Sequence, residues 1–174
     1  MVFGWEWKTE TARQNFVNIL SMQFSTGTLR EKDIPEAIIL ADEIVDIEGG
    51  FPDSFAVLTV IGDVYANAAI NASKNRELFD KFIEEVEQIQ GMASKHVVDG
   101  EIKNPYTHDE LVNRMHLSQY YENYCTVGFA RYLQSYDGQS YNEKHLLAIK
   151  PFLENAIILS PKNGRLKYIK SCLQ

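Results

Sequence analysis

The sequence predicts an all-α fold, and three observations support this prediction. Apolar residues recur at three- and four-residue intervals through most of the chain, the spacing of one face of an α-helix. Alternation with the two-residue period of a strand extends over no long segment. Turn signals rich in Gly, Pro, Asn and Asp separate the helical segments. With 45% hydrophobic and 24% charged residues, the chain fits a single domain over residues 1–174.

Start and stop signals place about seven helices in order. An aromatic lead with Phe3, Trp5 and Trp7 precedes them. The helices are expected from about Thr9 or Thr11 to Ser25, from Asp33 to Gly49, from Pro52 to Asn71, from Asn75 to Gln90, from Thr107 to Ser135, from Tyr141 to Leu159, and after Gly164. Residues 91–106 have weak periodicity and are expected to form the longest irregular connection.

Three helices are expected to begin with a capping box, in which two side chains three positions apart each bond a free backbone amide. The pairs are Asp33 with Glu36, Thr107 with Glu110, and Ser140 with Glu143. Leu117-Ser118 is a candidate break within the long helix. Pro151 is expected to kink its helix, because proline removes one backbone hydrogen bond.

The helix that starts at Asp33 is expected to be sandwiched between other helices. Its apolar residues surround much of the helix and leave only a narrow charged strip for water. That strip contains Glu36, Asp42, Glu43 and Asp46.

Two groups of residues resemble parts of the tetratricopeptide (TPR) pattern. Leu58, Ile61, Gly62 and Tyr65 match the first helix of a repeat, and Leu153, Ala156 and Pro161 match the end of the second. Tyr124, Val127 and Gly128 echo the first group, and Gly128 follows Gly62 by 66 residues, close to two periods of about 34. The resemblance implies antiparallel helix hairpins stacked as a short TPR-like α-solenoid. The alternative is an irregular helical bundle with the same helix-pair geometry.

A TPR-like stack implies a groove that holds a partner polypeptide. The first helix of each pair would line this groove, and the partner-binding residues would be Thr59, Asp63, Asn67, Phe129 and Tyr132. Tyr136 is added because six tyrosines lie within the 22 residues from Tyr120 to Tyr141, and tyrosine suits a protein interface. Ordinary core packing is the alternative for these residues.

Charge is distributed unevenly along the chain. The net charge of −7 argues against a nucleic-acid partner, since phosphate contacts need concentrated Lys and Arg. The segment from Glu31 to Asp53 contains eight acidic residues and a single basic residue, Lys32. The last stretch is basic, with Lys162, Arg165, Lys167 and Lys170. Either these are solvated faces at opposite ends of the molecule, or the acidic surface steers a basic partner protein.

A cytoplasmic location is expected. Cys125 and Cys172 are too few for a disulfide framework, and the N-terminus lacks the pattern of a cleavable signal. No segment reaches the roughly 18 apolar residues of a membrane span, so no membrane partner is expected.

A catalytic site is not predicted. The four histidines are scattered without metal-ligand spacing and are expected on the surface, and Cys125 has no histidine within a helical turn. No cofactor or metal is expected.

The sequence therefore favours a non-catalytic protein-binding module, an adaptor or chaperone. The alternatives are an acidic inhibitor or immunity protein that neutralises a basic toxin and, less favoured, a small helical enzyme. The oligomeric state stays open.

Overall fold

The computed structural model describes residues 29–50, 54–103, 105 and 108–173. The α-helices within this part are α2 (Ile34–Glu48), α3 (Phe55–Asn71), α4 (Arg76–Ala93), α5 (Glu110–Gln134), α6 (Glu143–Leu159) and α7 (Gly164–Cys172). Two short 3-10 helices, η1 (Glu31–Asp33) and η2 (Ser94–His96), and a two-stranded antiparallel sheet of β1 (Val97–Val98) and β2 (Glu101–Ile102) complete it. The predicted all-α fold is confirmed. The predicted helix near Thr9 to Ser25 and the aromatic lead lie outside the described residues.

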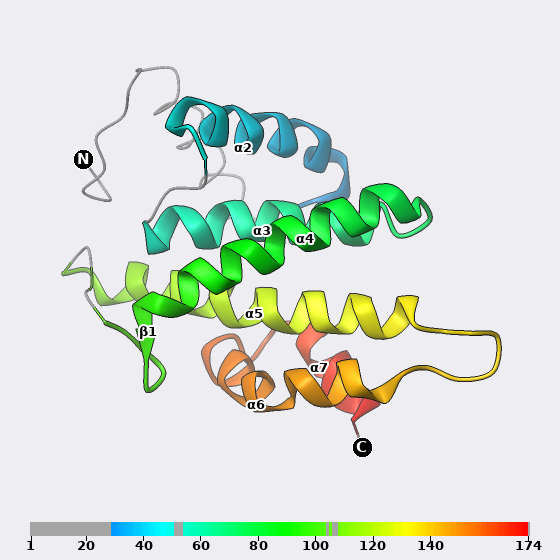
Figure 1. Cartoon of the computed structure of the whole chain (residues 1–174). Coiled ribbons are helices and arrows are strands. Elements are labelled where there is room, and N and C mark those ends of the chain that lie inside the picture. Colours follow the sequence, from blue (N-terminus) through cyan, green and yellow to red (C-terminus); the bar gives the residue numbers. More distant parts are fainter. Residues whose placement is uncertain (1–28, 51–53, 104, 106–107, 174) are drawn as a thin grey trace.

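The helices stack in chain order. Figure 1 shows α2 at the top, α3 and α4 below it, then α5, with α6 and α7 at the bottom. The chain direction reverses from each helix to the next between α2 and α6. α3 packs against α2, α4 and α5, and α5 packs against α6 and α7. The two most extensive contacts join the consecutive pairs α3–α4 and α5–α6.

α3 occupies the interior of this stack. Every residue from Phe55 to Ala69 is buried, although the sequence predicted that α2 would be the sandwiched helix. In α2 the side chain of Ile39 is 66% exposed. The near-absence of charge in α3 explains this: Asp63 is its only ionisable carboxylate, so the whole helix can be covered at little electrostatic cost.

Glycines allow the close helix crossings. A Cβ built at Gly62 of α3 would lie 3.3 Å from Cγ2 of Ile89 in α4 and 3.1 Å from Nδ2 of Asn123 in α5. At Gly128 of α5, a Cβ would overlap Cγ2 of Ile149 in α6. Gly62 and Gly128 therefore lie where side chains of neighbouring helices approach the backbone.

Two of the predicted capping boxes are not formed. Asp33 has helical backbone angles at the end of η1, and its carboxylate accepts a hydrogen bond from Nε of Arg30 at 2.7 Å. At α6, the N-cap is Asn142, which lies beyond the predicted Ser140 and whose Oδ1 accepts from the amide of Lys144 at 3.0 Å.

The cap of α5 also differs from the prediction. Thr107 lies outside the described residues, and Oδ1 of Asp109 accepts from the amide of Leu111 at 3.0 Å. α5 then continues through Leu117-Ser118 without a break. Pro151 lies inside α6, and the kink expected there stays a prediction.

The predicted irregular connection at residues 91–106 contains more structure than expected. α4 extends to Ala93, and the β1–β2 hairpin turns at Asp99 and Gly100, which have φ angles of 51° and 79°. Positive φ at both turn residues is typical of a tight hairpin turn.

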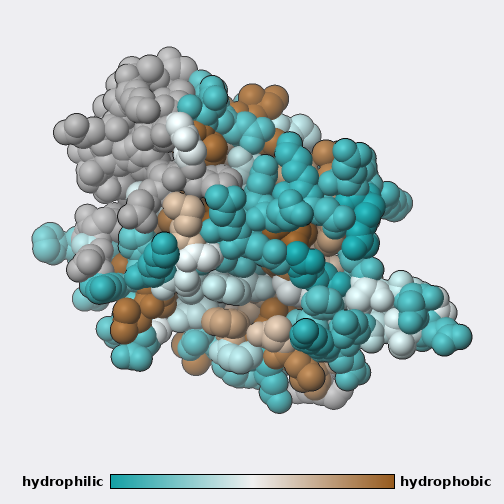
Figure 2. All heavy atoms as spheres, in the orientation of Figure 1, coloured by the Kyte–Doolittle hydropathy of each residue, from teal (hydrophilic) through white to brown (hydrophobic). Residues whose placement is uncertain are grey.

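The visible surface is mixed. Figure 2 shows a mostly hydrophilic face over α4, with hydrophobic patches toward the side where α6 and α7 lie. Leu147 and Ile158 of α6 are 58% and 65% exposed. None of the helices in the described ranges combines the length and apolar character that crossing a bilayer requires.

Candidate functional site

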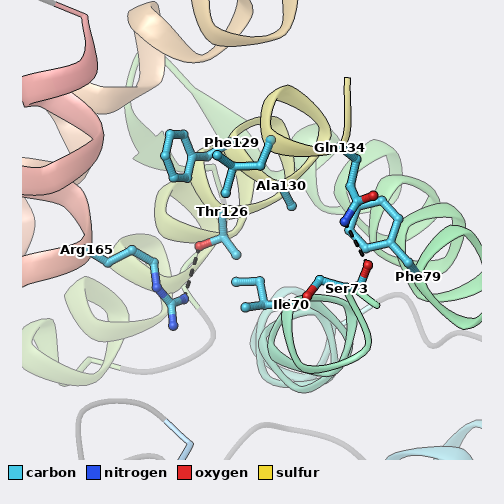
Figure 3. A pocket seen from close by; sticks show the side chains of 9 residues that line it. Ile70, Ser73, Phe79, Thr126, Phe129, Ala130, Gln134 and Arg165 are labelled. Atoms are coloured by element: carbon cyan, nitrogen blue, oxygen red, sulfur yellow. Dashed lines mark hydrogen bonds between the residues drawn. The ribbon is translucent and has the colours of Figure 1, made fainter. Parts of the chain in front are cut away.

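A pocket of about 200 Å³ lies between α3, α4, α5 and α7 (Figure 3). It is lined by Ile70, Ser73, Phe79, Thr126, Phe129, Ala130, Leu133, Gln134 and Arg165. The walls are mostly apolar. Ile70 and Leu133 are 37% and 47% exposed, so the pocket is accessible to solvent.

Arg165 provides the polar end of the pocket. The side chain of Asn163 caps α7 by accepting from the amides of Arg165 and Leu166 at 2.9 and 3.2 Å. The buried side chains of Leu166 and Ile169 fix α7 in place. The Arg165 guanidinium, on the exposed side of α7, then donates to Oγ1 of Thr126 at 3.4 Å.

The same guanidinium reaches α3. It donates to Oδ1 of Asn67 at 3.4 Å, so a single side chain connects α3, α5 and α7. Glu122 lies nearby on α5. Burial raises the pKa of Glu122, while hydrogen bonds from Ser118, Ser160 and Asn163 and the charge of Arg165 oppose that rise. Arg165 is therefore partly balanced by a carboxyl group.

Gln134 closes the opposite end. Its Nε2 donates to the backbone oxygen of Ser73 at 2.9 Å, shown in Figure 3, and its Oε1 accepts from Nη1 of Arg76 at 3.5 Å. The pocket thus has an apolar middle between two polar ends. This arrangement suits an apolar side chain flanked by backbone or polar groups.

A row of contacting aromatic rings adjoins the pocket. The aromatic row consists of Tyr168, Phe129, Tyr132, Tyr141 and Tyr136, with successive ring centroids 5.8, 5.9, 4.8 and 4.8 Å apart. Tyr136, Tyr141 and Tyr168 are 52%, 41% and 62% exposed. Exposed tyrosines that pack on one another present a rigid apolar surface with hydroxyl groups for hydrogen bonding.

The structure brings four of the six predicted partner-binding residues to this region. Phe129 lines the pocket, Tyr132 and Tyr136 belong to the aromatic row, and Asn67 holds Arg165. Asn67 is itself only 4% exposed, and its Nδ2 donates to the backbone oxygen of Asp63 at 2.8 Å. It can therefore position Arg165 but is not accessible as a contact residue.

Thr59 and Asp63 do not lie on an accessible groove. They are 2% and 8% exposed, which corrects their expected placement. Oγ1 of Thr59 donates to the backbone oxygen of Ala56 at 2.9 Å and lies 2.9 Å from Nδ1 of His116. Both residues are on the buried part of α3, where polar groups satisfy one another.

Several residues of the pocket were not predicted. Arg165 was noted only as part of a basic last helix, and Ile70, Ser73 and Gln134 were not singled out. The basic charge of α7 was the one available signal. The pairing of Arg165 with Asn67, 98 positions earlier, has no local sequence pattern.

Two titratable side chains of α5 are fully buried, His116 and Cys125. His116 is fully buried, so its predicted surface position is wrong, and burial lowers its pKa to about 4. Cys125 is likewise fully buried, and burial, followed by the charge of Glu122, raises its pKa to about 12. Within the described residues, no group of three His, Cys, Asp or Glu side chains is placed to hold a metal ion.

Comparison with known proteins gives no match: no family model, no curated protein and no solved structure is significantly similar to this chain.

Proposed function

We propose that the chain is a non-catalytic protein-binding module that holds a segment of a partner polypeptide at the α3–α5–α7 pocket. One observation carries this proposal: a solvent-accessible apolar pocket with polar ends lies beside the exposed aromatic row. Interfaces depend on aromatic anchors and on pockets that take an apolar side chain. The role of an adaptor or chaperone and a cytoplasmic location belong to the same proposal.

The helix order supports a TPR-like interpretation of this module. α3 and α5 are the first members of the two hairpins α3–α4 and α5–α6, and α7 follows against α5. In a repeat stack, the first helices line one side and present a common surface. α5 lines most of the pocket, and Ile70 of α3, Phe79 of α4 and Arg165 of α7 contribute to it. A surface lined by first helices is the expected place for a partner segment.

Matched leucine substitutions test this proposal. Leu133 lines the pocket, whereas Leu147 is equally apolar and exposed but lies on α6. Wild type, Leu133→Glu and Leu147→Glu are used as bait with native lysate, and bound proteins are quantified by mass spectrometry. We expect partners that Leu147→Glu retains and Leu133→Glu loses, because a carboxylate at the pocket mouth opposes apolar burial.

The same partners should remain bound in about 0.5 M salt, since an apolar contact is hardly screened. Circular dichroism and thermal melting confirm that both variants are folded. An identical set of partners on wild type and Leu133→Glu would contradict the proposal, as would self-association alone.

A second candidate, an acidic inhibitor of a basic protein, is favoured by one observation. α2 exposes Glu36, Asp42 and Asp46 on its surface. If this surface binds the partner, Glu36→Lys with Asp46→Lys should abolish capture, whereas Leu133→Glu should not. Association should then slow steeply as ionic strength rises.

A further inference from the structure

The exposed face of α2 carries negative charge around one large apolar side chain. Glu36, Ile39, Glu43 and Asp46 are three or four positions apart and so lie along one side of the helix. We call this set the acidic stripe. Glu36 and Asp46 are exposed, Glu43 is partly exposed, and Ile39 is 66% exposed between them.

Three basic side chains are exposed at the other end of the stack: Lys162 in the turn before α7, and Arg165 and Lys167 on α7. Tyr168 of α7 is 62% exposed. We call these four residues the basic stripe. Neither Lys162 nor Lys167 forms an ion pair with another described residue. Lys170, by contrast, pairs with Glu154 at 3.6 Å and is not included.

The two stripes cannot meet within one molecule. α2 and α7 are the first and last α-helices of the described ranges, and they lie at opposite ends of the stack in Figure 1. Complementary surfaces at opposite ends of a molecule can pair only between copies, in a head-to-tail manner.

We propose that the acidic stripe of one molecule docks on the basic stripe of a second copy of this chain. Charge complementarity selects the pairing and orients it, while Ile39 and Tyr168 bury apolar surface at its centre. Because the contact joins different surfaces, a bound pair still leaves one acidic stripe and one basic stripe available. Association therefore continues into short chains or closes into a ring.

Sedimentation velocity over a concentration series tests the proposal. At about 30 mM salt, the wild-type mass should rise above the monomer value, and at about 0.5 M salt it should return to it. That monomer value is 19.9 kDa. Glu36→Lys with Asp46→Lys should stay monomeric at low salt, and so should Lys162→Glu with Lys167→Glu. An equimolar mixture of these two variants should associate again, since each then supplies a surface complementary to the other.

A charge-matched control separates this pairing from a general effect of net charge. Glu84→Lys with Glu101→Lys makes the same change in net charge as Glu36→Lys with Asp46→Lys, but at exposed positions outside both stripes. This control should associate like wild type. Circular dichroism checks that all variants are folded. A wild type that stays monomeric at low salt would overturn the proposal and leave the acidic stripe for a basic partner protein. Failure of the mixture to associate would also overturn it.

Discussion

At the scale of single residues, the buried histidine is the most distinctive feature. His116 of α5 is fully buried, and its Nδ1 lies 2.9 Å from Oγ1 of Thr59 in α3. Because the Thr59 hydroxyl donates to the backbone oxygen of Ala56, its oxygen is left to accept from an Nδ1–H of His116. The neutral imidazole thus joins α3 to α5 at the centre of the stack.

The stability of the fold should depend on the protonation of His116. Burial lowers the His116 pKa to about 4, from an ordinary value of 6.5, while a hydrogen bond with Gln119 opposes this shift. Between these values the unfolded chain binds a proton that the folded chain does not. The free energy of unfolding should therefore fall as pH drops from about 6.5 to about 4, by about 3 kcal/mol in total. Urea unfolding at several pH values measures this loss.

Comparison with His116→Gln isolates this contribution. Glu85 and Glu122 have pKa values raised mainly by burial, so their protonation acts in the opposite direction. Wild type and His116→Gln both contain these two carboxyl groups. The difference between their stability–pH profiles therefore measures the contribution of His116. We expect the variant to lose less stability over this pH range. Parallel profiles would show that His116 does not titrate in this way.

At the scale of elements, the α5–α6 crossing depends on Gly128. Replacement by Ala should cost about 1–3 kcal/mol, since the new Cβ would overlap Cγ2 of Ile149 and the helices must separate. Gly91 of α4 is a matched control, because nothing lies within 4 Å of a Cβ built there. Gly91→Ala should gain up to about 1 kcal/mol from helix propensity. Chemical unfolding measures both variants.

A compensating substitution distinguishes steric overlap from other effects at this crossing. Ile149→Ala removes the overlapping methyl group, so Gly128→Ala should cost less in that background than in wild type. Equal costs in the two backgrounds would place the close contact elsewhere.

Element existence was easier to predict from the sequence than element boundaries. The helices near 33–48, 52–71, 75–90 and 141–159 all occur, because long apolar or amphipathic segments between turn signals favour helix whatever surrounds them. The caps were mostly mistaken. A Ser or Asp followed by Glu is a common pattern, whereas local backbone geometry decided in favour of Asn142 over Ser140 and of a 3-10 turn at Asp33. The β1–β2 hairpin was missed because its two-residue strands are too short to show alternation.

At the scale of the whole molecule, the candidate site depends on contacts between distant segments. Sequence reasoning could identify Phe129, Tyr132 and Tyr136 as candidate site residues, because it recognises position along one helix and a cluster of tyrosines. Thr59 and Asp63 were misplaced because their exposure depends on which helices surround α3. No periodicity in α3 encodes that arrangement, and none predicts that Arg165 meets Thr126 and Asn67.

Stability should be unequal along the stack. α3 is covered by α2, α4 and α5, with every residue from Phe55 to Ala69 buried, whereas α7 buries only Leu166 and Ile169. Native-state hydrogen exchange in low urea should therefore show α7 amides opening at lower free energy than α3 amides, which should exchange only through global unfolding. Asn163→Ala removes the cap of α7 and should lower its opening free energy further, by about 0.5–2 kcal/mol, with a smaller effect on α3. Identical denaturant dependence for amides of α3 and α7 would instead mean that the stack opens as one cooperative unit.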